Sequence, residues 1–590
     1  MLTRKLWSLL SVLMVLALVL AACAPAATPA PTQPPAPTPA KPTDAPKATE
    51  APKATEAPKA TEAPKATEAP KMELMSKSMP DCSYATAAGA TVPSLKSIEA
   101  VDELTVKFSL CAPDPAFLEA VAFGSMGIQS AKHLQDTGGK PVDQPLGTGP
   151  YVLKEWVKGD HVTLEANPNY WGEAPKTKTV IIKWNSEAAA RLTELQSGGV
   201  DGIDNVGKDD LATVKGDSTL ALYPRSPFNV MYLSFNNMMP PFDNDKVRQA
   251  LAIGIDRQTI IDKFYPPGTQ LADYFTPCDV LGGCEGDAWP KFDLAAAKKM
   301  LADAGVKAGT KLLLSYRNND RPYVPAQAKI AEEFQAQLKK LGFDVTLDQQ
   351  ESGPFLSAAQ EGKLQMAQLG WIGDFPDQLD WVGYHFNNPA EKQFGNIPVD
   401  LKDAISKANT TMDPAQRKQL FVAVNNLIKQ YVPMVPIAHS TSAVAFKAAV
   451  QGAHSSPLAN ELFAVMQIPG QDQLVFSQNG EPPGLYCADE TDGEAFRVCN
   501  QIFDGLYGYK VGSEEVQPAL AESCTPNATG DEWTCKLRSG AKFSDGTPLT
   551  ANDVVQTFAV QWDLNDPLHT GNTGDFGYWG ALFGANIPKK

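Results

Sequence analysis

A low-complexity tract near the N-terminus restricts folding to the part of the chain that follows it. Residues 24–72 are rich in Pro, Ala and Thr and contain four tandem copies of Ala-Pro-Lys-Ala-Thr-Glu that begin at Ala45. The copies have no large apolar side chain, so they cannot form a core, and their regular prolines favour extended polyproline II. At ~3.1 Å per residue, about 49 such residues reach on the order of 150 Å. We predict a disordered tether over 23–75 and a globular part from residue 76; low complexity without a function is the alternative.

The N-terminus has the pattern of an export signal. Arg4 and Lys5 precede an apolar run over 6–20, which has the length of a secretory signal and is short for a membrane anchor. The run ends in Leu-Ala-Ala-Cys23, which resembles the bacterial lipoprotein box. The resemblance implies a signal peptide over 1–22, lipidation of Cys23 and attachment to the outer face of the cytoplasmic membrane. An ordinary signal peptide with an incidental cysteine is the alternative.

Composition limits what the globular part binds. The chain has 590 residues, a formal net charge of −16 and 43% hydrophobic residues. This length predicts several domains or lobes with a substantial core. Binding to nucleic acid needs a basic surface, so the excess of acid excludes nucleic acid as a partner. Beyond the export signal, no apolar run approaches the ~20 residues that span a bilayer.

The cysteines indicate disulfides. Eight of the nine cysteines remain once Cys23 is set aside, and an even number suits disulfides in an exported protein. Their spacings do not match the two-residue knuckles of zinc sites, and the six histidines are scattered, so we predict no metal site and no cofactor. Three pairs follow from proximity and the fourth from the two cysteines left over: Cys278–Cys284, Cys487–Cys499, Cys524–Cys535 and Cys82–Cys111.

Helix and strand patterns alternate through the globular part. Alternating apolar residues predict a strand over 102–110, and Asp293 is placed to cap a helix. Residues 325–341 have the apolar period of a helix, with predicted strands at 312–314 and 343–347 on either side. A β-α-β unit with parallel strands follows, so the fold class is α/β.

A further predicted strand, 366–371, ends beside an aromatic residue and a carboxylate, Trp371 and Asp374. In open α/β sheets, ligands bind beyond the carboxyl ends of the strands. An aromatic ring next to a carboxylate at that position suits a cationic ligand with apolar flanks.

A succession of motifs in the globular part resembles a known family. In chain order the motifs lie at 145–151, 167–172, 198–201, 233–236, 240–243, 247–251, 255–257, 371–377 and 433–436. Together they resemble the extracytoplasmic solute-binding proteins of peptide and nickel ABC importers, solute-binding protein family 5. The resemblance covers the whole chain after the tether. It implies a two-lobe periplasmic-binding-protein-like fold, type II with three subdomains, with mixed sheets and a hinge.

The order of the motifs has one break. Residues 467–590 resemble the beginning of the family, whereas 76–110 begin within its second subdomain. No main element is duplicated or missing, so we infer a circular permutation: 76–466 supply the central and C-terminal parts of the fold, including a lobe at 234–448, and 467–590 supply the N-terminal part. Surface loops tolerate such permutation. A truncated tandem copy or a faulty gene model is the alternative.

The resemblance also implies a ligand site between two lobes. Asp374 matches the family carboxylate that pairs with a peptide's α-amino group, and Trp371 is placed beside the ligand. Asn236 is expected to bond the peptide backbone, and Asp489 and Glu490 lie on the first ligand-lining loop. Each has a structural alternative: a turn for Asp374, core packing for Trp371, a cap for Asn236, and a solvated face for the two acids. Chain crossings near 228–236 and 446–455 are expected to form the hinge.

The implied function is capture of dipeptides and oligopeptides for delivery to the transmembrane subunits of an ABC importer. A nickel chelate, heme or an oligosaccharide is an alternative ligand within the family. An enzyme is a hypothesis from another class, but Gly-x-Ser-x-Gly, His-Glu-x-x-His and Walker motifs are absent. Asp374 and Asp377 by themselves do not support a glycosidase couple. A surface adhesin would suit the tether but would not require two lobes. We therefore predict a binding protein and not an enzyme.

Overall fold

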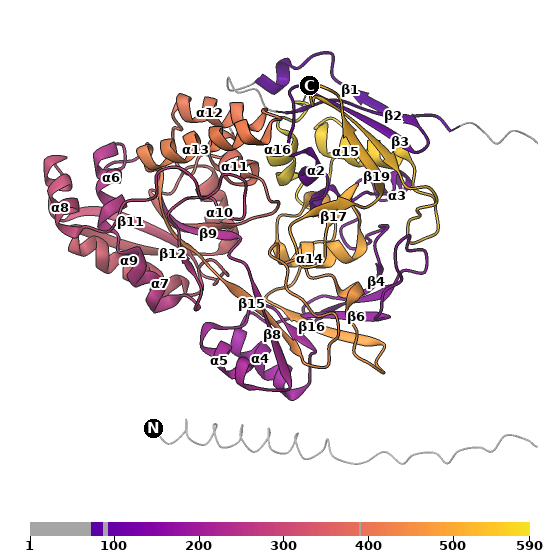
Figure 1. The fold of residues 1–590 in the computed structure, drawn as a ribbon, viewed down its shortest axis with the longest axis horizontal. Helices are drawn as coiled ribbons and strands as arrows, with labels where there is room; N and C mark the ends of the chain where they lie inside the picture. Colours follow the sequence, from indigo (N-terminus) through magenta and orange to yellow (C-terminus); the bar gives the residue numbers. More distant parts are fainter. Residues whose placement is uncertain (1–71, 87–92, 389–390, 590) are drawn as a thin grey trace, which may run out of the picture. The chain divides into compact units, whose positions relative to one another are not determined.

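The computed structural model describes residues 72–86, 93–388 and 391–589, which form three subdomains, each built on a β-sheet (Figure 1). We call them the small subdomain (72–137 and 516–589), the first lobe (138–225 and 442–515) and the second lobe (229–439). The predicted signal peptide, the lipid box at Cys23 and the tether up to residue 71 lie outside the described residues.

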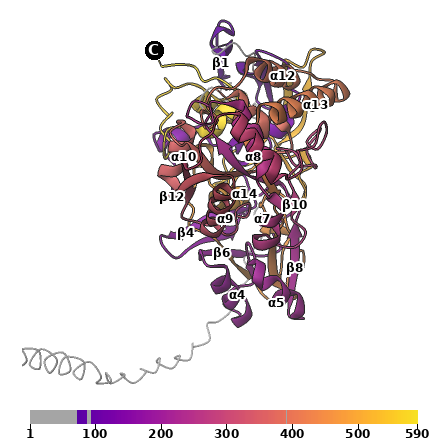
Figure 2. The same cartoon turned by 90° about the vertical axis from the view of Figure 1, so that its left-hand side faces the viewer.

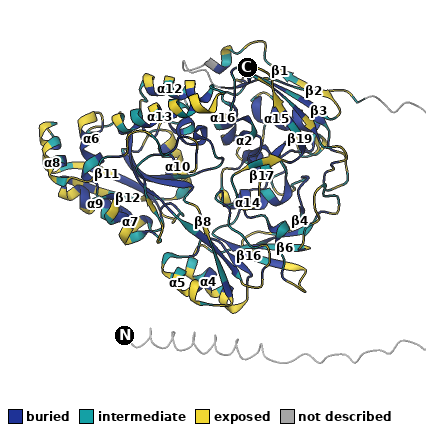
Figure 3. Ribbon diagram, in the orientation of Figure 1, coloured by how far each residue is buried: buried dark blue, intermediate teal, exposed yellow. Residues whose placement is uncertain are grey.

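The second lobe has a six-stranded mixed sheet. Helix α9 (Gln327–Lys340) links the parallel strands β11 (Thr310–Arg317) and β12 (Phe343–Gln350), which confirms the predicted β-α-β unit. Strand β13 (Met366–Ile372) is parallel to β11, whereas β9 (Asn229–Phe235) is antiparallel to β13. In Figure 3 the central strands are buried and the helices carry exposed faces. The other elements are β10 (Gln270–Leu271), β14 (Met434–His439), α6 (Asp245–Gly254), α7 (Arg257–Phe264), α8 (Leu294–Asp303), α10 (Ser352–Gln360), a π-helix at Leu379–Gly383, α11 (Tyr384–Asn387), α12 (Val399–Asn409) and α13 (Pro414–Tyr431).

The first lobe has a seven-stranded mixed sheet whose middle strand comes from the C-terminal part of the chain. Strand β16 (Gln473–Gln478) lies parallel between β6 (Thr179–Trp184) and β7 (Gly202–Ile203). Helices α4 (Ala188–Ser197) and α5 (Leu211–Gly216) lie at the end of the lobe away from α12 and α13 (Figure 2). The other elements are β4 (Tyr151–Val157), β5 (His161–Ala166), β8 (Leu220–Arg225), β15 (Ser442–Lys447), α14 (Gly493–Ile502) and β17 (Tyr507–Tyr509).

The small subdomain has a five-stranded antiparallel sheet that also joins distant segments. Strand β20 (Glu532–Leu537) pairs with β3 (Thr105–Leu110), so that Trp533 lies opposite Phe108. A capping box between Thr550 and Asp553 begins α15 (Ala551–Trp562), the long helix of this subdomain. The other elements are β1 (Ser76–Ser78), β2 (Leu95–Asp102), β18 (Val516–Pro518), β19 (Ala521–Pro526), α2 (Phe117–Ala120), α3 (Ala131–Asp136) and α16 (Gly577–Phe583).

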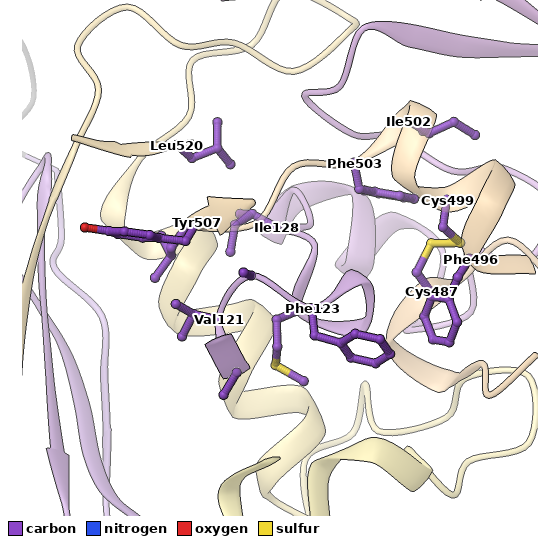
Figure 4. Close-up of a cluster of buried hydrophobic side chains, with 14 of the residues drawn as sticks. Val121, Phe123, Ile128, Cys487, Phe496, Cys499, Ile502, Phe503, Tyr507 and Leu520 are labelled. Carbon is purple, nitrogen blue, oxygen red and sulfur yellow. A yellow bond between two sulfur atoms is a disulfide. The ribbon is translucent and has the colours of Figure 1, made fainter. Parts of the chain in front are cut away.

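One hydrophobic core joins the small subdomain to the first lobe. Figure 4 shows Val121, Phe123 and Ile128 packed with side chains of α14, among them Phe496, and of the segment that follows it, which begins with Phe503. The rings of Phe123 and Phe496 lie 4.9 Å apart. Residues 467–590 therefore share two sheets and a core with 95–225 and do not form a separate domain.

Two short crossings connect the first and second lobes. Strand β8 leads into β9 through residues 226–228, and β14 leads into β15 through 440–441. Asn229 and Ser440 tie the crossings together: the Asn229 Nδ2 donates to the Ser440 carbonyl at 2.7 Å, and the Ser440 N–H donates to Asn229 Oδ1 at 2.9 Å. The sequence placed the crossings later in the chain and the lobe at 234–448. The observed lobe boundaries differ from the predicted ones because β9 pairs with β13 in the second lobe, whereas β15 pairs with β7 and β8 in the first lobe.

Four disulfides stabilise the described part of the chain. They join Cys82 to Cys111, Cys278 to Cys284, Cys487 to Cys499 and Cys524 to Cys535, with Cα–Cα distances from 4.0 to 6.0 Å. The last links facing residues of β19 and β20. Of the helices within the described ranges, none has the length and apolar character to cross a membrane.

Candidate functional site

A cavity of about 1140 Å³ lies where the three subdomains meet. One wall belongs to the second lobe and includes Trp371, near the end of β13, and Asp374, which follows the strand. The opposite wall comes from the loop before α14, with Asp489 and Glu490, and from residues 572–586 of the small subdomain. The volume exceeds that of a typical small-molecule pocket and leaves room for a peptide.

Asp374 and Asp380 form a carboxyl pair at the end of β13. The Asp380 carboxyl accepts hydrogen bonds from the Trp371 Nε1 at 3.1 Å and from the Asp374 backbone N–H at 2.8 Å. Burial and the nearby Asp374 charge raise the pKa of Asp380 well above its usual value. Asp380 therefore positions its neighbours, and Asp374 is the member of the pair that lines the cavity.

The Asp374 carboxyl has unused hydrogen-bonding capacity. Burial raises its pKa to about 7, and a hydrogen bond with the Tyr578 side chain opposes the rise. Its Oδ2 is buried and has no hydrogen-bond partner among the described residues. A buried acceptor without a donor is costly, so a ligand that brings a donor, and above all a cation, is stabilised here.

Two arginines of the second lobe line the same cavity, although no predicted motif of the sequence includes them. Arg317 ends β11; its guanidinium donates to Ser352 Oγ at 3.2 Å and to the Tyr323 hydroxyl, while its buried Nε has no partner in the described structure. Arg321 lies in the turn that follows, 3.8 Å from the Glu494 carboxylate of the first lobe. The parallel pairing of β11 and β13 could have revealed them, because parallel strands end at one edge of a sheet.

The acids of the opposite wall have partners within that wall. Asp489 accepts hydrogen bonds from the backbone N–H groups of Thr573 at 2.5 Å, Gly574 at 2.8 Å and Phe576 at 2.7 Å, and so holds the loop before α16. Glu490 accepts a hydrogen bond from Asn572 Nδ2 at 3.1 Å, and burial raises the pKa of its carboxyl to about 7. The carboxylates of this wall therefore use much of their hydrogen-bonding capacity to stabilise the wall itself.

Two acidic residues at the start of α14 interact with each other, and one of them contacts Arg321. Asp492 caps the helix by accepting from the Glu494 N–H at 3.0 Å. Burial and the Glu494 charge raise the pKa of Asp492 to about 7, whereas Arg321 lowers that of Glu494 against the effect of burial. Glu494 is thus the ionised partner in a contact between the lobes.

The structure places four of the five predicted ligand residues at the cavity: Asp374, Trp371, Asp489 and Glu490. Asn236 lies elsewhere; its amide donates to the Gly362 carbonyl at 2.7 Å and accepts from the Met238 N–H at 3.0 Å. It follows β9, which is antiparallel to β13, so it lies at the edge of the sheet where β13 begins, away from the cavity.

The described residues contain no group of three or more His, Cys, Asp or Glu side chains that could hold a metal ion. His385, which lines the cavity, is buried, and this burial lowers its pKa to about 4, so its ring is neutral at physiological pH. The polar groups of the cavity suit a ligand that carries both a cationic and an anionic group.

A two-lobe α/β chain with a cavity between its lobes has the architecture of a periplasmic binding protein. The chain belongs to the bacterial extracellular solute-binding proteins, family 5, whose family model matches residues 67–393 and 515–578.

Curated relatives carry peptide-binding and heme-binding names. The chain is 32% identical over 359 residues to Di/tripeptide-binding protein 1 of Pseudomonas aeruginosa; the match covers 59% of this chain and 66% of that protein, slightly under two thirds of its length. It is 28% identical over 390 residues to Heme-binding protein A of Haemophilus influenzae, with 64% and 70% covered. Among solved structures, the dipeptide-binding protein of Pseudoalteromonas sp. SM9913 in complex with Met-Leu has a TM-score of 0.58 at 24% identity, with 65% and 77% covered, which shows a shared fold.

Proposed function

We propose that this protein is an exported binding protein that captures dipeptides and oligopeptides and delivers them to the membrane subunits of an ABC importer. One observation carries the proposal: a single cavity has the unpartnered Asp374 Oδ2 and two guanidinium groups, Arg317 and Arg321. A peptide with free termini has an ammonium group and a carboxylate of matching charge.

The amino end of the peptide is assigned to Asp374. An α-ammonium group donates up to three hydrogen bonds, and a desolvated ammonium–carboxylate pair is strong when its geometry is good. Trp371 stacks on Tyr384, with ring centroids 4.4 Å apart, which leaves aromatic surface beside this anchor. The peptide carboxylate is assigned to the arginines, because a guanidinium matches a carboxylate in a bidentate geometry.

Calorimetry with Ala-Ala and N-acetyl-Ala-Ala tests the amine anchor. Asp374→Asn keeps the shape of the side chain and removes its charge, so it should weaken Ala-Ala binding by about 30-fold or more, the effect of losing a partner of a buried charge. The acetylated peptide should bind the wild type weakly and respond little to the substitution. Asp472→Asn, which removes an exposed acid that pairs with Lys178 at 3.0 Å, is the control for net charge. Equal binding of both peptides to the wild type would reject the amine anchor, and binding of neither peptide would favour heme or another solute.

We also infer that the chain order is a circular permutation of the family fold. In support, β16 and β20 come from the last part of the chain yet pair with β6, β7 and β3. The lipid anchor at Cys23 and the importer as a partner belong to the same proposal, which requires no catalysis.

A further inference from the structure

We propose that the cavity selects peptides with a basic side chain and that Glu391 recognises the cation. This inference rests on the proposed peptide-binding function. It concerns a residue beyond the two peptide termini, and it specifies the class of peptide.

Glu391 lies in the same cavity as Asp374, in the segment that follows α11. The Glu391 Oε1 accepts a hydrogen bond from the Gln393 backbone N–H at 2.9 Å, and the Gln393 Oε1 accepts one from the Tyr232 hydroxyl at 3.1 Å. Both Asp374 and Glu391 act electrostatically on the Tyr384 phenol. Tyr384, stacked on Trp371, therefore lies within reach of both carboxylates.

Glu391 lacks a cation. The ion pairs within the described ranges include Arg321 with Glu494 and Arg417 with Asp377, but none involves Glu391. Burial raises the pKa of its carboxyl to about 7, with no guanidinium or ammonium group to oppose the rise. The Glu391 residue is half-buried, and only backbone groups, of Gln393 and Lys392, stabilise its charge. A partly desolvated carboxylate without a counter-ion is destabilised, and a cationic ligand reduces that penalty.

The surroundings of Glu391 suit a long basic side chain. Gln393 is 5% exposed and lines the cavity, and its Nε2 has no partner in the described part of the chain. That donor is available to a peptide carbonyl, and the Asn387 Oδ1, which also lacks a partner there, is available to an ammonium group. Lysine and arginine place their alkyl stems on apolar surface and their charge against aromatic faces, which the Trp371–Tyr384 stack provides.

Norleucine tests the charge because it has nearly the shape of lysine without the ammonium group. Calorimetry at pH 8, where Glu391 is ionised, compares Lys-Ala with norleucyl-Ala and Ala-Lys with Ala-norleucine. The wild type should bind the lysine member of at least one pair about tenfold or more tightly. Glu391→Gln should abolish this preference while norleucine peptides bind as before. Glu361→Gln removes an exposed acid, paired with Lys363, from the same lobe and should leave the preference intact.

The outcomes separate this inference from the function on which it rests. If norleucine peptides bind the wild type and lysine brings no gain, the cationic preference is rejected and peptide binding stands. If the preference survives Glu391→Gln, the cationic preference stands but its assignment to Glu391 is rejected, because a purely structural role of Glu391 in its loop predicts that result. If none of the four peptides binds, both proposals are rejected.

Discussion

The two walls of the cavity use their charged groups differently. On the second-lobe wall, the Asp374 Oδ2 and the Arg317 Nε have no partner among the described residues. On the opposite wall, Asp489 is saturated by donors of the 573–576 loop, and Glu494 pairs with Arg321. The comparison indicates that the second lobe supplies the charges for a ligand, whereas the opposite wall maintains its own loop and contacts the second lobe.

Removing Asp489 would test the structural role of the opposite wall and should have the largest effect. Asp489→Ala leaves the N–H groups of Thr573, Gly574 and Phe576 without their acceptor. A buried unsatisfied group costs ~1–3 kcal/mol, and the part-buried N–H groups of Thr573 and Gly574 cost less than that of Phe576. We therefore expect a loss of about 2–4 kcal/mol in the free energy of unfolding, measured by urea denaturation. Peptide affinity should fall as the wall loosens. Unchanged stability would contradict the division between the walls.

The pH dependence of binding tests the proposed role of Asp374 on the second-lobe wall. The ligand-bound form needs an ionised Asp374, whose pKa is raised to about 7 in the free protein. Affinity for Ala-Ala should therefore fall up to tenfold per pH unit below 7, and calorimetry across pH 5–8 should lose this component of the dependence in Asp374→Asn. The ligand-free protein should behave in the opposite way. A raised folded-state pKa makes the contribution of Asp374 to stability most favourable at low pH, and this contribution is lost as pH rises from about 4 to about 7.

The contact between the lobes should give the smallest effect. Glu494→Gln frees the Arg321 guanidinium from a carboxylate 3.8 Å away. Although Glu494 is buried, the 3.8 Å contact is too long for a hydrogen bond. We therefore expect its loss to contribute no more than ~1 kcal/mol, and affinity for a peptide with a free carboxylate should rise about two- to fivefold. The same peptide with an amidated C-terminus is the control, and its affinity should not rise. If the affinity for both peptides falls by the same factor, Glu494 contributes to binding mainly by holding the lobes together.

The sequence predicted only some of the residues on the second-lobe wall. Trp371 and Asp374 were predictable because they lie at the end of a recognisable strand, and ligands bind at the carboxyl ends of such strands. Arg317 required knowledge that β11 is the parallel neighbour of β13. Asn236 was assigned to the site on resemblance alone, and the antiparallel direction of β9 places it at the other edge of the sheet. Glu391 follows no strand or motif, so no local signal pointed to it.

The sequence by itself determined many of the local elements and the family. Helix α9 follows from its apolar period, and three of the disulfide pairs follow from short spacing. Tertiary structure alone decided that Arg321 meets Glu494 and that Asp489 holds the loop at 573–576. The partners in these contacts are 173 and 84 residues apart, because 494 − 321 = 173 and 573 − 489 = 84. The periodicity of apolar residues and the spacing of motifs give information only about neighbouring helical turns or strands. Strand direction and the packing of shared cores bring distant side chains to one cavity.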